Sequence, residues 1–444
     1  MAQPNAPNVS LPCSWLRATT PPRRRVKREV MPLPPRHRPL GIRALNRVGS
    51  GFKALGMKWP SLDESNLLST AIRRAGSDDF GGEGFREGMS VLLDSLECEA
   101  ELTTLGRLSC RETLLGYLEN RLRLQQYRLA HPELDQEVIE RPVFIVGLPR
   151  TGTTILFNLL SQDARNRPPL SWEVQWPVPP PEAATYDTDP RIQDAVKVFK
   201  NLDRLLPTLP AIHEFGASLP QECVPIRAHE FLSVQFQSTF NVPGYQAWFE
   251  RQDVLPAYAF HKRFLQHLQS KYMKDRWVLK SPAHLAAIDE ILETYPDAQI
   301  IHTHRDPAKV VPSLASLLYT FRSMNSDSLD PKRIGRQVMD MWTLALQRAT
   351  EARRRHRDKP TQFFDAYFED TLADPVDLLR RAYDSFGLDF TDETRDRMAT
   401  FLAANPRGSR GVHRYVLGDF DLDLGEIRER FSEYCTQFGV PLSA

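Results

Sequence analysis

Residues 141–160 read RPVFIVGLPRTGTTILFNLL, and this stretch decides the fold. A short apolar run, Val143 to Val146, leads into a loop bounded by Gly147 and Gly152, and an apolar helical pattern follows at once. A strand, a glycine-bounded loop and a helix start can cradle a phosphate, because the loop N–H groups and the free N–H groups of the first helical turn face the same anion. The sequence therefore predicts an anion-binding loop here.

The loop has the Gly-x4-Gly spacing of a Walker A motif, but Thr153 stands where the Walker A lysine is needed. The cation lies inside the loop instead, at Arg150. A nucleoside triphosphate with bound magnesium depends on the missing lysine, and no acidic magnesium ligand follows an apolar strand. The pattern favours a smaller, metal-free anion over the first alternative, a P-loop kinase or NTPase.

Two further apolar strands are predicted to end in a cation. Gln299 to Thr303 leads through His304 into Arg305 and a helical pattern, and Trp277 to Leu279 leads into Lys280 and a proline. A guanidinium can fork onto phosphate oxygens, which makes Arg305 a candidate phosphate ligand. The alternatives are an arginine paired with a nearby carboxylate and a lysine that extends along the surface.

These segments together resemble the sulfotransferases that use 3′-phosphoadenylyl sulfate (PAPS) as sulfuryl donor. In that family a Pro-Lys/Arg-Ser/Thr-Gly-Thr-Thr loop binds the 5′-phosphosulfate, and an Arg and a Ser eight residues apart bind the 3′-phosphate. Arg305 and Ser313 match that second pair, and Lys280 matches the lysine that reaches the sulfuryl group. The resemblance assigns donor binding in the loop to Gly147, Pro149, Arg150, Thr151, Gly152, Thr153 and Thr154.

The resemblance also suggests a general base and a late donor ligand. Glu173 lies where tyrosylprotein-type and glycan sulfotransferases carry their basic glutamate, counted from Arg150. The alternative bases are His213, Glu214, Glu222 and His229. Arg410 lies in a late basic, glycine-containing loop of the kind that closes over the 3′-phosphate.

The implied reaction moves the sulfuryl group from PAPS to a hydroxyl acceptor and releases adenosine 3′,5′-bisphosphate (PAP). Glu173, Lys280 and Arg150 are the expected catalytic residues, and no metal is expected because protein cations neutralise the leaving group. A small molecule, a lipid or a glycan could be the acceptor, a nucleic acid partner is not expected, and a homodimer stays open. The second alternative is a non-catalytic nucleotide-binding protein of the same fold.

Composition sets the class of protein and the expected compartment. The chain has 444 residues, 41% of them hydrophobic and 25% charged, which is ordinary for a globular protein with a core. No apolar run approaches the roughly 18 residues that a membrane span needs. Five scattered cysteines predict neither zinc ligands nor a disulfide framework, and they favour a reducing, cytoplasmic location.

Three regions are predicted along the chain. Residues 1–60 carry 12 lysines and arginines against one acid, Glu29, and are expected to form a basic, Pro-rich and mostly disordered tail that could contact an anionic surface. Residues 61–135 carry apolar residues at helical spacing and are expected to form a helical segment. Residues 136–444 alternate strands and helices, which predicts an α/β, P-loop-like three-layer fold with a central parallel sheet. Its ligands would collect at the carboxyl ends of the strands.

Overall fold

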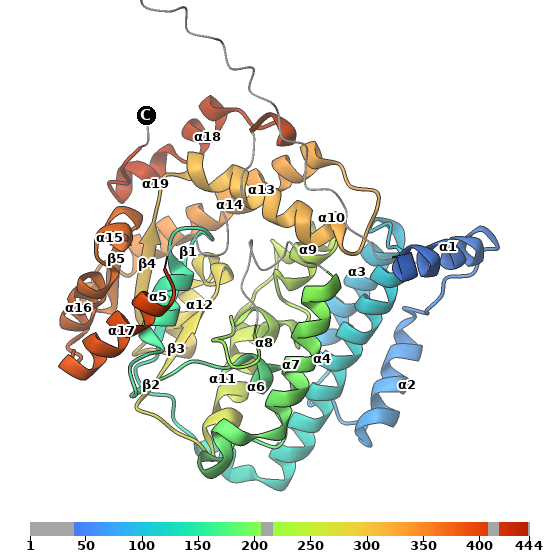
Figure 1. Ribbon diagram of the computed structural model, residues 1–444, viewed down its shortest axis with the longest axis horizontal. Coiled ribbons are helices and arrows are strands. Elements are labelled where there is room, and N and C mark those ends of the chain that lie inside the picture. Colours follow the sequence, from blue (N-terminus) through green and yellow to red (C-terminus); the bar gives the residue numbers. More distant parts are fainter. Residues whose placement is uncertain (1–39, 206–215, 407–416, 443–444) are drawn as a thin grey trace, which may run out of the picture. The chain divides into compact units, whose positions relative to one another are not determined.

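The computed structural model describes residues 40–205, 216–406 and 417–442. Its centre is a five-stranded parallel sheet with the order β2-β3-β1-β4-β5 (Figure 1). Strands β1, β3 and β4 match the three strands predicted from the sequence, whereas β2 is too short to give a pattern. The strands are β1 Val143–Gly147, β2 Asn166–Arg167, β3 Arg276–Lys280, β4 Gln299–His304 and β5 Phe363–Tyr367.

The register of the sheet brings the three predicted motifs together. Gly147, the last residue of β1, pairs with Thr303 of β4, and Ile145 of β1 pairs with Lys280 at the end of β3. Because all these strands are parallel, the residues that follow their carboxyl ends lie at one edge of the sheet. The expectation of an α/β fold with a central parallel sheet is confirmed, and the three motifs lie at one edge of that sheet.

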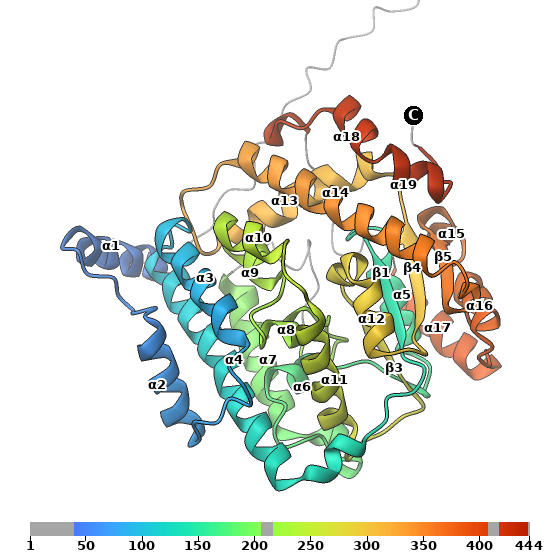
Figure 2. The same cartoon turned by 180° about the vertical axis from the view of Figure 1, so that it is seen from behind.

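Alternate residues of β1 face two different cores. Val143 and Ile145 pack with α5 and α16, while Phe144 and Val146 pack with the helices on the opposite face. Figure 2 shows α12 in front of the strands, and Figure 1 shows α5 and α17 in front of the opposite face. The first group of helices is α5 Thr153–Leu160, α16 Pro375–Phe386 and α17 Asp392–Ala404. The second is α11 Leu255–Gln269, α12 Ile288–Thr294, α13 Pro307–Ser323 and α14 Pro331–Arg355.

The predicted helical segment has a core of its own. Its helices are α2 Glu64–Ala75, α3 Phe85–Cys98 and α4 Thr104–Ala130, and they pack with α8 Val224–Ala228, α9 Gln235–Thr239 and α10 Pro243–Phe249. Asp63 caps α2 by accepting a hydrogen bond from the N–H of Asn66. The helical nature of this segment is therefore confirmed.

Part of the expected tail is ordered, which corrects the prediction for residues 1–60. Residues Leu40–Ala54 form helix α1, which packs on α4; residues 1–39 lie outside the described residues. The side chain of Asn46 accepts a hydrogen bond from the N–H of Leu105 at 3.0 Å. A Cβ at Gly49 would come within 1.7 Å of the hydroxyl oxygen of Thr104, so α1 lies very close to α4 there. The short apolar stripe of α1 was hidden by the surrounding prolines and arginines.

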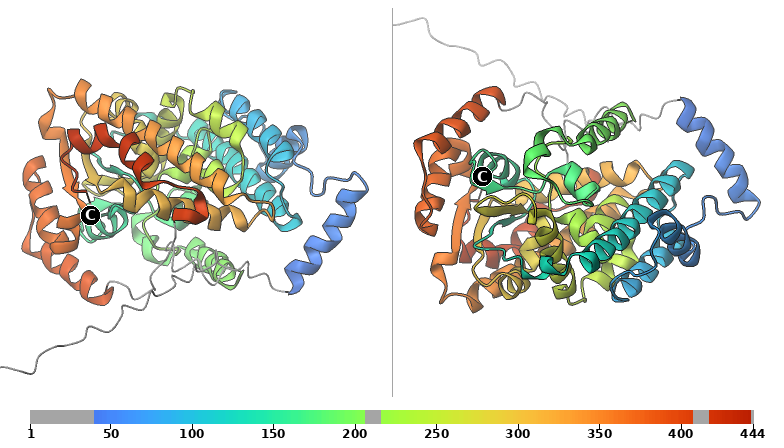
Figure 3. Two further views of the ribbon diagram at one scale, coloured as in Figure 1. Left: turned by 90° about the horizontal axis from the view of Figure 1, so that it is seen from above. Right: turned by 90° about the horizontal axis from the view of Figure 1, so that it is seen from below.

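The remaining elements are short and lie around these cores. Figure 3, seen from above, shows the red C-terminal helices α18 and α19 over α13 and α14. The other helices are α6 Ser171–Gln175, α7 Pro190–Leu205, α15 Phe368–Ala373, α18 Leu424–Arg430 and α19 Ser432–Gln437. The 3₁₀ helices are η1 Pro132–Gln136, η2 Ala183–Thr188, η4 Pro282–Ala286, η5 Pro360–Gln362 and η6 Leu417–Phe420. Within the described ranges, no helix combines the length and the apolar character needed to cross a bilayer.

Candidate active site

Two glycines shape the predicted phosphate loop. Gly147 has a φ of 143°, and a Cβ there would lie 2.1 Å from the Thr303 hydroxyl oxygen and 2.7 Å from the Thr303 carbonyl oxygen. Gly152 has a φ of 93° and occupies the N-cap of α5. Both positions combine a backbone conformation that L side chains avoid with close packing, so glycine is needed at each.

The loop delivers the chain into the N-terminus of α5. Gly152 has no side chain with which to cap the helix, so the N–H groups of the first turn have no capping side chain there. Thr153 is buried and Thr154 is exposed in this same turn. Free N–H groups and a helix dipole together favour an anion at this position.

Arg150 and Thr151 have different surroundings within the loop. Thr151 is buried, and its hydroxyl oxygen lies 2.6 Å from the Leu148 carbonyl oxygen and 2.6 Å from the Thr303 hydroxyl oxygen. Its side chain therefore fixes the loop from inside. Arg150 is exposed and has a φ of 69°, a left-handed conformation that is unfavourable for a non-glycine residue. Such local strain is typical of functional sites.

Arg305 connects the second motif to the loop. Its guanidinium donates a hydrogen bond to the Arg150 carbonyl oxygen at 2.5 Å and lies over the ring of Phe368, 3.7 Å from the centroid. Asp306 caps α13 by accepting from the N–H of Ala308, and Ser313 is buried in the second turn of that helix. The structure thus brings Arg150 and Arg305 into contact although 155 residues separate them.

Lys280 is the buried end of β3 and pairs with Glu222. Its ammonium forms an ion pair with the Glu222 carboxylate, and it lies 6.0 Å from the centroid of the Phe157 ring on α5. The Lys280 side chain is 4% exposed and that of Glu222 is 18% exposed. The Lys280 carbonyl accepts a hydrogen bond from the N–H of Cys223, which fixes the segment that carries Glu222 beside β3.

Glu173 lies in a setting different from the one expected of a base. It is completely buried, and its carboxylate accepts hydrogen bonds from Arg167 at 2.7 Å, the Leu170 N–H at 2.8 Å and the Tyr186 hydroxyl at 3.1 Å. Burial raises the pKa of Glu173, although Arg167 and the hydrogen bonds oppose that rise. The structure brings Glu173 together with Arg167, and it places Glu222 beside Lys280.

The other sequence candidates are either core residues or lie outside the described ranges. His229 is buried against Tyr117, Phe260 and Phe264, and burial lowers its pKa to about 4. It is therefore a neutral histidine of the core. His213, Glu214 and Arg410 are outside the described residues.

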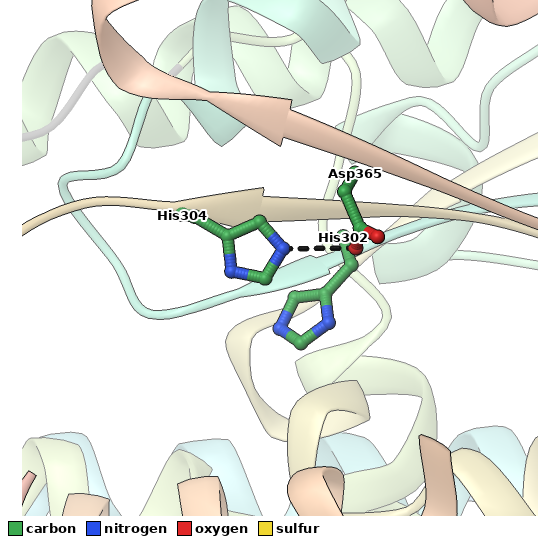
Figure 4. A group of neighbouring side chains, drawn as sticks. All are labelled: His302, His304 and Asp365. Carbon is green, nitrogen blue, oxygen red and sulfur yellow. Dashed lines mark hydrogen bonds and ion pairs between the residues drawn. The ribbon is translucent and has the colours of Figure 1, made fainter. Parts of the chain in front are cut away.

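The sequence did not predict a polar cluster on the strand residues that immediately precede Arg305. His302 and His304 of β4 lie beside Asp365 of β5, and their ligand atoms all lie within 4.8 Å of one another (Figure 4). The Arg353 guanidinium donates hydrogen bonds of 2.6 and 3.0 Å to the two carboxylate oxygens of Asp365. A cation bound here would have to displace this guanidinium. The residue types alone gave no signal, because the partners come from three separate segments.

Hydrogen bonds in this cluster fix the protonation of its members. Burial opposes ionisation of Asp365, but hydrogen bonds from His304 and Arg353 outweigh it and hold the pKa of Asp365 well below its usual range. Burial lowers the pKa of His304, which contacts Asp365 at 2.9 Å and the Tyr434 hydroxyl at 3.0 Å. A neutral His304 can donate to the carboxylate and accept from the tyrosine, which anchors the end of β4 next to Arg305.

The fold and the site together define a class: a P-loop-like α/β protein that binds a phosphorylated ligand without a Walker lysine. The Sulfotransferase family matches residues 142–392. The crystal structure of sulfotransferase STF1 from Mycobacterium tuberculosis has a TM-score of 0.75 and 34% identity, covering 83% of this chain and 98% of its own. The crystal structure of sulfotransferase STF9 from Mycobacterium avium has a TM-score of 0.80 and 29% identity, and the match covers 87% of this chain and 99% of STF9.

A curated relative extends this comparison to a characterised acceptor. Stf3 of Mycobacterium bovis, named an omega-hydroxy-beta-dihydromenaquinone-9 sulfotransferase, is 28% identical over 312 residues. The match covers 66% of this chain and 76% of Stf3. The chain belongs to the sulfotransferase family. It is an enzyme that transfers a sulfuryl group from PAPS, and this resolves the choice against a P-loop kinase.

Proposed function

We propose that this enzyme sulfates the hydroxyl group of a lipid acceptor, with Glu222 as general base and Lys280 beside the sulfuryl group. The observation that carries the proposal is the ion pair of these two residues at the end of β3. The general base and the lysine that contacts the sulfuryl group must lie close together, because the acceptor oxygen loses its proton to the base as it attacks the sulfur atom. The lipid class follows the acceptor in the name of the relative Stf3.

The remaining site residues would hold the donor. The loop N–H groups, Thr153 and Thr154 face the 5′-phosphosulfate in this proposal, and Arg305 and Ser313 face the 3′-phosphate. Thr151 acts indirectly, because its hydroxyl lies against Leu148 and Thr303 inside the loop. Gly147 and Gly152 allow the close approach of the backbone.

Transfer would proceed by in-line displacement at sulfur. Glu222 accepts the acceptor proton while the acceptor oxygen bonds to sulfur, and the bond from sulfur to the bridging phosphate oxygen breaks. Negative charge then grows on the 5′-phosphate of PAP. Lys280 and the N-terminus of α5 would stabilise this charge because they are held in place before the reaction begins, and the Arg150 guanidinium would add a further positive charge.

Donor binding and turnover test the proposal separately. PAP should raise the melting temperature of the enzyme, whereas ATP with magnesium should not. Labelled PAPS should then label a long-chain alcohol more rapidly than a monosaccharide of matched hydroxyl type. A higher rate with the monosaccharide would contradict the lipid acceptor and leave the donor assignment standing, and a shift with ATP alone would contradict the donor assignment.

A further inference from the structure

Helix α1 exposes apolar side chains on the face that points away from α4. Leu40, Ala44 and Val48 follow one another at a spacing of four residues, and Leu55, just after the helix, is also exposed. The exposed fractions are 80% for Leu40, 60% for Val48 and 77% for Leu55. We call these four residues the α1 stripe. A solvated helix face normally carries polar side chains, so the α1 stripe needs an explanation.

The opposite face of α1 already has its partner. Ile42, Leu45 and Asn46 are half-buried on the side of α4, where Asn46 accepts from the Leu105 N–H. The helix is therefore anchored through one face, and the α1 stripe is a second, separate apolar face. By contrast, the surface of α17 carries charged side chains such as Asp392 and Arg395.

The charges around the α1 stripe have one sign. Arg43 and Arg47 are exposed and flank the stripe along the helix. Between Glu29 and Asp63 the sequence holds six lysines and arginines and no acid. Residues 1–28 add six more lysines and arginines, and Glu29 is the only acid before Asp63 in the sequence. A partner for this surface must therefore offer an apolar region that can bury the α1 stripe and negative charges that can pair with the arginines.

We propose that the α1 stripe, with Arg43 and Arg47, docks the enzyme on an anionic lipid bilayer. An amphipathic helix in the headgroup region buries its apolar ridge and places its arginines among lipid phosphates. A bilayer suits this surface because a single helix presents a convex ridge, and a fluid surface needs no complementary groove. The proposal does not depend on the identity of the sulfate acceptor.

Co-sedimentation with lipid vesicles tests the proposal on the full-length chain. The parent should bind phosphatidylglycerol vesicles more tightly than phosphatidylcholine vesicles, and salt should weaken that binding. Replacing Leu40, Val48 and Leu55 by Ser should weaken partitioning on the order of 100-fold, because apolar burial drives insertion. Replacing Arg43 and Arg47 by Gln should weaken it by roughly 25-fold, about fivefold for each basic side chain near the surface.

Matched variants elsewhere provide the controls. Replacing the exposed Leu129, Val138 and Met273 by Ser removes as much surface apolarity away from α1 and should leave vesicle binding unchanged. Replacing Arg357 and Lys359 by Gln controls for charge. All variants should keep the parental PAP-induced thermal shift, which shows that they are folded.

Three outcomes would overturn the proposal. The first is equal vesicle binding by the parent and the α1 stripe variant, which would assign any binding to the basic residues that precede the helix. The second is no binding of the parent to anionic vesicles. The third is a parent that forms a lipid-independent dimer which the α1 stripe variant loses, because the stripe would then be an interface between two copies of this chain.

Discussion

Two neighbouring strands end in a buried cation that pairs with a glutamate. Arg167 ends β2 and pairs with Glu173, whereas Lys280 ends β3 and pairs with Glu222. The Glu173 side chain is completely buried and receives two further hydrogen bonds, while the Glu222 side chain is 18% exposed. The comparison teaches that two ion pairs of the same kind at neighbouring strand ends can differ in burial and in the number of further hydrogen bonds.

The Arg167–Glu173 pair, which we call the closed pair, is rigidly held. The Arg167 guanidinium lies 4.3 Å from the centroid of the Trp277 ring and 5.1 Å from that of Tyr272, so aromatic side chains cover it. Removing one partner from such a pair leaves an uncompensated buried charge. The Lys280–Glu222 pair, which we call the open pair, should exchange a partner for a ligand at smaller cost, because the Glu222 side chain is only partly buried.

The largest expected effect is on turnover in Glu222→Gln. The rate constant kcat should fall by roughly 10²–10⁴, because the amide cannot accept the acceptor proton. The parent should lose activity on the acid side of its pH–rate profile as the base is protonated, and the variant should lack that limb. Single-turnover kinetics with labelled PAPS measure the change.

A surface pair is the control for that variant. Glu182 pairs with Lys271 at 2.8 Å, and both side chains are largely exposed. Glu182→Gln should therefore turn over at the parental rate. Parental activity in Glu222→Gln together with an inactive Glu173→Gln that is fully folded would reverse the assignment of the base.

The second effect is on stability in Glu173→Gln. The free energy of unfolding should fall by about 3–5 kcal/mol, because Arg167 keeps a buried charge without its carboxylate. Chemical denaturation measures this loss. The folded fraction should retain a kcat close to that of the parent, whereas an unchanged free energy of unfolding would remove the contrast between the two pairs.

Arg305→Ala sharpens the comparison by testing whether anions bind beside the open pair. PAP affinity should fall from several-fold to about a hundredfold, in line with roughly 1.5–3 kcal/mol for a charge-assisted hydrogen bond. Isothermal titration calorimetry with PAP measures this change. The exposed Arg380, which pairs with Asp377, provides an Arg→Ala control with no expected effect. Equal PAP affinity in Arg305→Ala and the parent would remove the second motif from the donor site.

The ion pair of Asp365 with Arg353 is intermediate between the buried pair of Glu173 and a surface pair, since the Asp365 side chain is 32% exposed. Asp365→Asn should lower the free energy of unfolding by about 1–3 kcal/mol, because Arg353 and His304 lose an ionised acceptor. Solvent screening should keep the loss near the lower end of that range. Chemical denaturation compares this variant with Asp377→Asn, a control at the surface.

The pH dependence of the free energy of unfolding provides a second test of Asp365→Asn. The pKa of Asp365 is lower in the folded state, so its ionisation stabilises the fold above about pH 4, and that contribution is lost as the pH falls further. Asp365→Asn should therefore lose less stability than the parent on acidification below this pH. Parallel pH curves for the two proteins would contradict the role of Asp365.

The strands and phosphate motifs could be predicted because their signals are local. Gly147, Gly152 and the apolar run before them act over a few residues, and the structure reproduces that strand, loop and helix. The parallel sheet followed from the alternation of strands and helices. Only β2, with two residues, was too short to show a period.

The partners of the motifs could not be predicted, because they depend on contacts across long sequence separations. Glu173 and Glu222 are both glutamates near a proline, and only the fold closes Arg167 over one and brings Lys280 to the other. The assignment of Glu173 relied on its distance along the chain from Arg150, which does not determine the direction of a side chain.

The contact between Gly147 and Thr303 has a consequence for engineering. A Cβ at Gly147 would lie only 2.1 Å from the Thr303 hydroxyl oxygen, so β4 leaves no space for any residue other than glycine at the end of β1. Grafting a Walker-type loop, or one selective for another donor, would therefore require redesign of β4 as well.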